Sequence, residues 1–246
     1  MTAEFVILLL AGAFAGGFIN GLAGFGTSLF ALGWWLQVME PRHAVALVLV
    51  MSVVSGLQGV VRVRNAIEPR RLAVFLIPAL VGIPIGLQIL EHIDARTLKL
   101  IVAGFLLTYG LYFIWRRSLP SVQGDWPVAD GTIGFAGGVL GAIAGLSGAL
   151  PTMWLSMRDW AKEKTRAVLQ PYNVIVLGLA ALGLAIDGAF DREVLITIAI
   201  AFPVTMIAAQ IGLWLFGRLT DLQFRRLLIA LMMVSGCVLL ARELTA

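Results

Sequence analysis

Clusters of charged residues divide the chain into long uncharged runs, and these runs constrain the fold more than any other feature. They cover residues 5–39, 44–61, 72–90, 100–115, 131–157, 167–186, 194–217 and 227–241. Most approach the ~20 residues that a helix needs to cross the hydrocarbon core of a bilayer. They lack the apolar and polar alternation of barrel strands, whereas helices satisfy their own backbone in lipid. The sequence therefore predicts an all-α, multi-pass membrane protein.

The composition excludes a water-soluble domain. Of the 246 residues, 60% are hydrophobic and 13% charged, against about half and a quarter in soluble domains. The excess of basic residues fits cytoplasmic loops, so we expect no nucleic-acid partner. Cys237 has no partner for a disulfide or a cysteine-based metal site, and we expect no metal and no cofactor. Glu4 stands where a signal peptide would be basic, so we expect the segment from Phe5 to be retained.

The second half of the chain resembles the first. Residues 23–27 (Ala-Gly-Phe-Gly-Thr) align with residues 144–148 (Ala-Gly-Leu-Ser-Gly), and Pro78 with Pro203 and Gly86 with Gly212 follow in the same order. We interpret residues 1–120 and 121–246 as two repeats within one transmembrane domain.

The loop charges predict that the two repeats have opposite orientations. The loop at residues 62–71 is basic, whereas the equivalent loop at 187–193 is acidic. By the positive-inside rule, such loops lie on opposite sides of the membrane. We therefore expect cytoplasmic loops at 62–71, 116–117, 158–166 and 218–226, and both termini in the periplasm of a bacterium, with the chain in its inner membrane.

The first segment of each repeat is predicted to break inside the membrane. Residues 5–39 would form a single helix of roughly 52 Å, too long for a bilayer, yet they are too few for two complete spans. Glycines at 21, 24 and 26 weaken the helix, and residues 145–148 repeat the pattern. We expect two shortened helices meeting at each break, as a broken or re-entrant hairpin, followed by three transmembrane helices. Whether the first segment crosses fully stays open.

These breaks predict the substrate site. Irregular backbone at membrane depth is tolerated where it lines a wet cavity, and the helix that leaves each break points its unpaired N–H groups there, which suits an anion. The runs offer neutral polar residues, with no carboxylate and no buried cation. Gln170 and Asn173 flank a break expected at Pro171-Tyr172. The candidate substrate-binding residues are Asn20, Gly24, Phe25, Gly26, Thr27, Ser28, Ser52, Gly145, Ser147, Gly148, Gln170 and Asn173.

Two further residues are candidates for gating or steering. His43 and Lys164 align between the halves, and each stands where a span begins. They would attract an anion at the two mouths of the cavity. The alternative is an ordinary interfacial side chain.

The motifs resemble those of the sulfite exporter TauE/SafE family. The resemblance rests on residues 17–26 (Gly-Phe-Ile-Asn-Gly-Leu-Ala-Gly-Phe-Gly), on residues 141–148 (Gly-Ala-Ile-Ala-Gly-Leu-Ser-Gly) and on the two-half layout. It implies secondary transport of a small sulfur-containing anion, such as sulfite or an organosulfonate, across the inner membrane.

Alternatives to such a carrier remain open. An anion channel would use the same site without an occluded state, and a carrier of a carboxylate would share the chemistry. The sequence holds no intramembrane carboxylate pair, histidine cluster or cysteine nucleophile with a base, so we expect no enzyme. The partners expected are the small anion and the lipid bilayer. Export or uptake, and a monomer or a homodimer, are equally compatible with the sequence.

Overall fold

The computed structural model describes residues 2–94, 96–98, 100, 101, 103, 104, 107, 108, 111, 122–158, 160, 162–220 and 223. Within these residues the fold is all-helical, without strands, as predicted. The predicted span at 227–241 lies outside them, and most of the one at 100–115 does as well.

Six helices of the described chain are long and apolar enough to cross a membrane. Three of them begin with a proline in the first turn, where its missing N–H group has no intrahelical acceptor to lose. The helices are α1 (Ala3–Ala23), α2 (Thr27–Trp35), α3 (Pro41–Val63), α4 (Pro69–His92), α6 (Pro127–Ala144), α7 (Ala149–Ser156), α8 (Lys162–Ile186) and α9 (Arg192–Phe216), with a 3₁₀ turn (Arg64–Ala66) after α3. Those of spanning length are α1, α3 with its 3₁₀ turn, α4, α6, α8 and α9.

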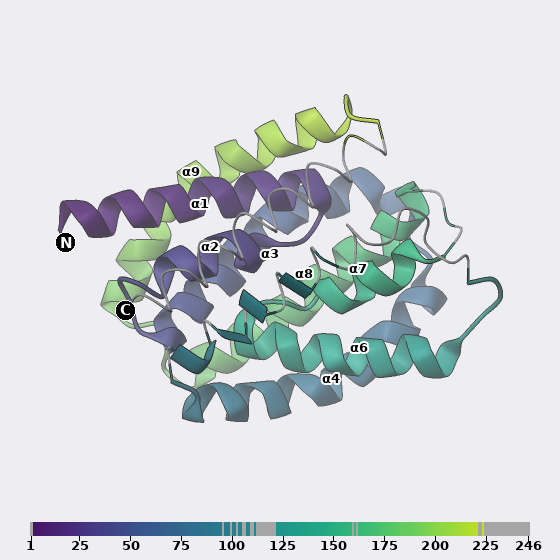
Figure 1. Cartoon of the computed structure of the whole chain (residues 1–246), viewed down its shortest axis with the longest axis horizontal. Helices are drawn as coiled ribbons and strands as arrows, with labels where there is room; N and C mark the ends of the chain where they lie inside the picture. Colours follow the sequence, from purple (N-terminus) through teal and green to yellow (C-terminus); the bar gives the residue numbers. More distant parts are fainter. Residues whose placement is uncertain are drawn as a thin grey trace.

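Two pairs of helices flank a central pair. Helix α1 packs along α9 and α4 packs along α6, with α3 and α8 in contact between them (Figure 1). Glycines bring the flanking helices together, because a side chain at Gly86 would clash with the backbone of Val139, and one at Gly212 with that of Phe18. Such close approach is typical of small residues in membrane helices. The two contacts join equivalent positions of the aligned halves.

The helix directions follow from these contacts. Along α1 and α9, Gly17 lies against Thr205 and Gly21 against Ala209, so the two helices run in parallel. The same holds for α4 and α6. In contrast, α3 and α8 are antiparallel, since Gly56 meets Val174 and Gly59 meets the earlier residue Gln170. The short connections after α3 and α8 reverse the chain, so α4 is antiparallel to α3 and α9 to α8. Together these directions place the start of α6 at the opposite end of the bundle from the start of α1.

Each short helix folds back along the long helix before it. The indole Nε1 of Trp35, at the end of α2, donates to Leu9 O of α1 over 3.1 Å. The indole Nε1 of Trp154 in α7 donates to Asp130 Oδ1 of α6 over 2.6 Å. The chain returns toward the end at which each hairpin began. The expectation of shortened helices is right for α2 and α7 but wrong for α1 and α6, which both reach the length of a span.

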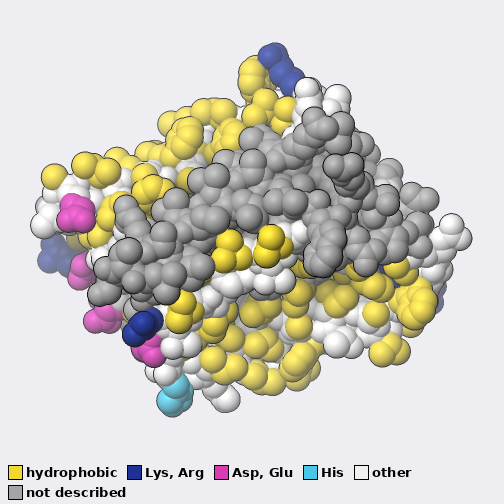
Figure 2. Space-filling view, viewed as in Figure 1, with side chains coloured by type: hydrophobic (Ala, Val, Ile, Leu, Met, Phe, Trp, Pro, Cys, Tyr) yellow, Lys and Arg dark blue, Asp and Glu magenta, His cyan; other side chains and the backbone are white. Residues whose placement is uncertain are grey.

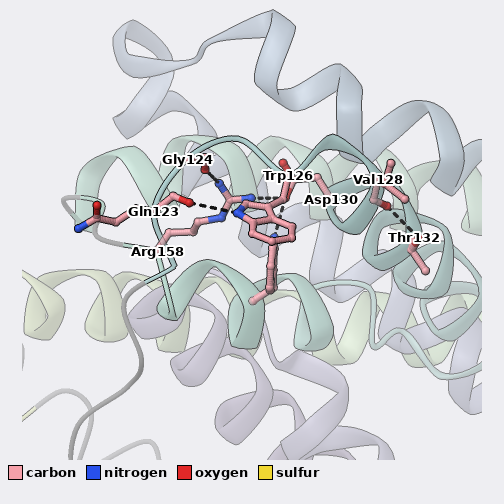
Figure 3. A network of polar contacts seen from close by, with 8 residues as sticks. Gln123, Gly124, Trp126, Val128, Asp130, Thr132 and Arg158 are labelled. Atoms are coloured by element: carbon pink, nitrogen blue, oxygen red, sulfur yellow. Dashed lines mark hydrogen bonds and ion pairs between the residues drawn. The ribbon is translucent and has the colours of Figure 1, made fainter.

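Arg158 closes the second hairpin at its open end (Figure 3). Its guanidinium forms an ion pair with Asp130 at 2.7 Å and donates to Gly124 O at 2.6 Å. It also stacks over the ring of Trp154, 5.0 Å from the centroid. Because the arginine is buried and its charge is matched by the carboxylate, this contact ties the end of α7 to the start of α6 without an unpaired charge.

The outer faces of the flanking helices are apolar. In Figure 2, hydrophobic side chains cover the flanks in view, and charged side chains lie toward the ends of the molecule. The exposed residues include Phe14 of α1, Ile77 and Val81 of α4, and Phe202 and Ile207 of α9. Apolar surface of this extent is suited to lipid, which makes the chain a multi-pass membrane protein.

Charged contacts lie at the two opposite ends of the bundle. At one end, Lys164 lies 3.8 Å from Glu68. At the other, His43 lies 3.6 Å from Asp191, and Arg42 donates to Asp187 O. The loops expected in the cytoplasm at 62–71 and 158–166 therefore meet at one end, and the end of α9 before 218–226 lies there too, since Phe216 contacts Arg166. The expected loop at 116–117 lies outside the described residues.

The orientation of these ends gives a first testable prediction. On a Cys237→Ala background, we expect Asp187→Cys to react with an impermeant reagent added to intact cells, and Arg64→Cys to remain unlabelled. Both native side chains are exposed, at opposite ends of the bundle. Labelling of Arg64→Cys with protection of Asp187→Cys would reverse the orientation.

Candidate functional site

Glycines in the left-handed conformation break both hairpins where the sequence predicts. Helix α1 ends at Gly24, with φ of 81°, and Gly26, with φ of 98°, precedes α2. Helix α6 ends at Gly145, with φ of 67°. In both cases the terminal glycine N–H donates over 2.7 Å to a carbonyl four residues earlier. Side chains are disfavoured at such φ angles, so glycine is the residue that permits each break.

The two breaks meet inside the bundle. Ser28 Oγ, in the first turn of α2, donates to Gly145 O over 2.8 Å. Beside this contact is a cavity lined by residues of both breaks and of the central helices α3 and α8. The predicted substrate residues that line it are Asn20, Gly24, Phe25, Gly26, Ser52, Gly145, Ser147, Gly148, Gln170 and Asn173.

Two of the predicted substrate residues do not line the cavity. The Ser28 hydroxyl is engaged by Gly145 O. Thr27 is buried against Gly16 of α1, and its Oγ1 has no partner in the described structure. Both side chains are buried between the hairpin segments and lie outside the cavity lining.

The lining is neutral throughout the described residues and rich in hydrogen-bond donors. Asn20 Nδ2 donates to Ser55 Oγ over 2.6 Å and to Ser52 O over 3.1 Å. The hydroxyl of Ser52, which is buried, lacks a partner. Ser55, which is not among the candidate residues, accepts from Asn20 but does not line the cavity; it stands one helical turn after Ser52, on the same face of α3.

Asn173 connects the central helix α8 to both breaks. Its Nδ2 donates to Gly24 O over 3.2 Å, and its Oδ1 accepts from Ser147 Oγ over 2.9 Å. One turn earlier on α8, Gln170 Nε2 donates to Gly56 O of α3 over 3.1 Å. The amide donors of the cavity and the Ser147 hydroxyl are thus engaged by acceptors from other helices or breaks, whereas the Ser52 hydroxyl has no partner among the described residues.

The break expected at Pro171-Tyr172 is wrong. Helix α8 runs without interruption from Lys162 to Ile186, with Pro171 inside it. Neighbouring helices can satisfy the backbone group that a proline frees, so membrane helices tolerate it. Gln170 and Asn173 reach the cavity because they lie three residues apart on one helical face, not because the helix is broken.

The absence of a buried cation, expected from the sequence, is also wrong. Arg166 is 7% exposed and lies on α8 one turn before Gln170. Its Nη2 donates to Gly21 O over 3.0 Å and its Nε to Gln170 Oε1 over 3.2 Å. The spacing of Arg166, Gln170 and Asn173 on one helical face is the signal that could have placed it near the site.

The candidate gating residues stand outside the cavity, toward opposite ends of the bundle. His43 lies beside Asp191 at the start of α9. Lys164 lies beside Glu68, with its ammonium 5.2 Å from the centroid of the Trp160 ring. Both are partly exposed and lie beside carboxylates. Neither residue lines the neutral cavity.

The cavity is too small for a substrate anion in this conformation. Its free space for the centre of a water-sized sphere is about 10 Å³, which is room for about one water molecule. A sulfur oxyanion has several heavy atoms, so the lining must separate before one can enter.

A multi-pass helical bundle with a small polar cavity between two broken hairpins is the arrangement expected of a membrane transport protein. The family model described as sulfite exporter TauE/SafE matches residues 8–239, and the chain belongs to this family. It is 27% identical over 209 residues to a protein of Cupriavidus necator described as a probable sulfite/organosulfonate exporter TauE, covering 80% of this chain and 79% of that protein. No solved structure matches.

Proposed function

We propose that this protein is a secondary carrier that moves a small sulfur-containing anion, sulfite or an organosulfonate, across the bacterial inner membrane. The observation that carries the proposal is the meeting of two glycine breaks at a neutral, donor-rich cavity inside the bundle. Each break is followed by a helix whose first turn no side chain caps, so its amide groups favour negative charge. The Cupriavidus relative, described as a probable exporter of such anions, supports the substrate class.

The lining suits the oxygens of such an anion. Amide donors from Asn20, Gln170 and Asn173 and hydroxyl donors from Ser52 and Ser147 come from four different helices or breaks around one small space. A hydrogen bond to a charged group contributes ~1.5–3 kcal/mol, so several together could hold an anion reversibly. Glycines at the breaks leave space for close approach to the backbone.

Alternating access is the mechanism we propose for transport. The two halves are interpreted as inverted repeats, supported by the opposite starting ends of α1 and α6 and by the equivalent contacts of Gly86 and Gly212. Motion of one hairpin unit against the other would expose the cavity to each side in turn. The cavity has room for about one water molecule in this conformation, and the experiment below distinguishes a carrier from a channel.

Transport in proteoliposomes tests this function. With the purified protein and radiolabelled sulfite outside, we expect unlabelled sulfite inside to accelerate uptake, because a carrier returns faster when loaded. Liposomes without protein are the control. Anion currents that need no substrate on the far side would indicate a channel instead. Counterflow with carboxylates and none with sulfite, methanesulfonate or thiosulfate would replace the substrate class.

The donors of the lining give a second prediction. We expect Asn20→Ala and Ser147→Ala each to weaken anion affinity about tenfold, which corresponds to one lost hydrogen bond of ~1.4 kcal/mol. Isothermal titration calorimetry on folded, monodisperse variants measures the effect.

Thr205→Val is the matched control for these variants. Thr205 is fully buried in α9 with an unpartnered Oγ1, and it does not line the cavity. We expect it to keep the affinity of the unmodified protein. Unchanged affinity in both lining variants would exclude Asn20 and Ser147 from the site.

A further inference from the structure

Arg166 is a buried cation that no carboxylate of the described structure pairs with. Its two hydrogen-bond acceptors, Gly21 O and Gln170 Oε1, are neutral. Its Nη1 is buried and has no partner. The guanidinium also stacks over the ring of Phe216, 4.4 Å from the centroid. Within the part of the chain that the structure describes, no group balances the positive charge of this guanidinium.

Arg158, which is also buried, is an arginine of this protein whose charge is balanced. Arg158 has a similar exposure, 6% against 7%, but it forms an ion pair with Asp130 at 2.7 Å. A buried charge without a partner is costly because water no longer solvates it. No described residue gives Arg166 the counter-charge that Asp130 gives Arg158, and a bound anion is a candidate for it.

Arg166 lies directly behind the cavity. It donates to the same Gln170 side chain that lines the cavity and donates onward to Gly56 O. A Cβ atom at Gly24, another lining residue, would stand 3.5 Å from Arg166 Nε. One side chain therefore separates the guanidinium from the neutral lining. In a poorly solvated interior, a unit charge that is one side chain away from the cavity still attracts an anion bound there.

We propose that Arg166 is the charge-selecting residue of the site, for which the transported anion is the counter-ion. The inference rests on the proposed transport function and adds the group that selects for charge. The neutral donors around the cavity recognise the oxygens of the ligand, whereas Arg166 favours an anion over a neutral molecule and a dianion over a monoanion. Gly21 O and Gln170 Oε1 hold the guanidinium in place in this conformation.

Binding of two anions of different charge tests this role. In the purified full-length protein, affinities for methanesulfonate, a monoanion, and for sulfite at alkaline pH, a dianion, are measured by calorimetry. Loss of a positive charge costs a dianion about twice the Coulomb energy that it costs a monoanion. For Arg166→Gln we therefore expect a loss of about tenfold for methanesulfonate and about a hundredfold for sulfite.

Two variants separate charge from structure. Arg166→Lys keeps the charge without the guanidinium geometry, and we expect it to restore the preference for the dianion. Arg218→Gln removes one positive charge from an exposed residue at the same end of the bundle, and we expect both affinities to remain within twofold, on the order expected for a screened surface charge. The thermal unfolding midpoint of each variant verifies that it is folded.

The outcomes distinguish this inference from the function on which it rests. Unchanged affinities in folded Arg166→Gln, or equal losses for the two anions, would overturn the role of Arg166 and leave the transport function standing. An unmodified protein that binds neither anion would overturn both.

Discussion

Substitution of Gly145 by valine is expected to abolish anion binding. The residue has φ of 67°, a conformation that side chains rarely adopt, and its added Cβ would clash with Ser28 Oγ and lie 2.7 Å from Val48 Cγ1. Valine would therefore separate the two breaks that Ser28 joins and push atoms into the cavity lining. Calorimetric titration of sulfite into the folded variant measures the affinity, and we expect no detectable binding.

Gly188→Val controls for the strain at a positive φ. Gly188 has φ of 74°, but nothing lies within 4 Å of its added Cβ, and it stands in the turn between α8 and α9. The left-handed conformation costs a residue with a side chain about 1–2 kcal/mol, so both variants lose stability. We expect Gly188→Val alone to bind sulfite normally. Normal affinity in Gly145→Val as well would place the anion elsewhere.

Asn173→Asp is expected to have a similarly large effect with almost no change in shape. The carboxylate removes the donor to Gly24 O and places a negative charge in the cavity lining. Two like charges about 4 Å apart repel by ~4 kcal/mol at an effective dielectric of 20, so sulfite affinity should fall about a thousandfold. The measurement is again calorimetry on monodisperse protein.

Gln58→Glu is the matched control for Asn173→Asp. Gln58 is a partly buried amide on α3 that donates to Met206 Sδ and does not line the cavity. The substitution adds the same charge to a neighbouring span without contacting the anion. We expect a loss of less than tenfold, since a more distant charge acts more weakly. Equal losses in the two variants would indicate a general effect of intramembrane charge rather than a site at Asn173.

The breaks could be predicted from the sequence because local chemistry determines them. Residues 5–39 are too long for one span and too short for two, and glycine is the residue that tolerates the φ angles at positions 24 and 26. The length of α1 could not be predicted in this way. It depends on packing against α9, where Gly17 and Gly21 let the two backbones approach.

Arg166 and Pro171 show where sequence reasoning fails. Arg166 was assigned to a cytoplasmic loop because it stands among other charged residues, at the edge of an apolar run. Its burial depends on acceptors from α1 and α8 that only the folded bundle brings together. Likewise, whether a proline interrupts a membrane helix depends on its neighbours and not on the proline itself.

The hydrogen bonds of Asn173 use the same donors that an anion in the cavity would need. This side chain ties α8 to the first break through Gly24 O and to the second through Ser147 Oγ. An anion that accepts from the Asn173 amide competes with Gly24 O, and one that accepts from the Ser147 hydroxyl competes with Asn173 Oδ1. Under the proposed carrier function, each oxygen that the ligand binds in this way replaces one hydrogen bond between α8 and a break, so substrate binding would loosen the contacts that hold the cavity together.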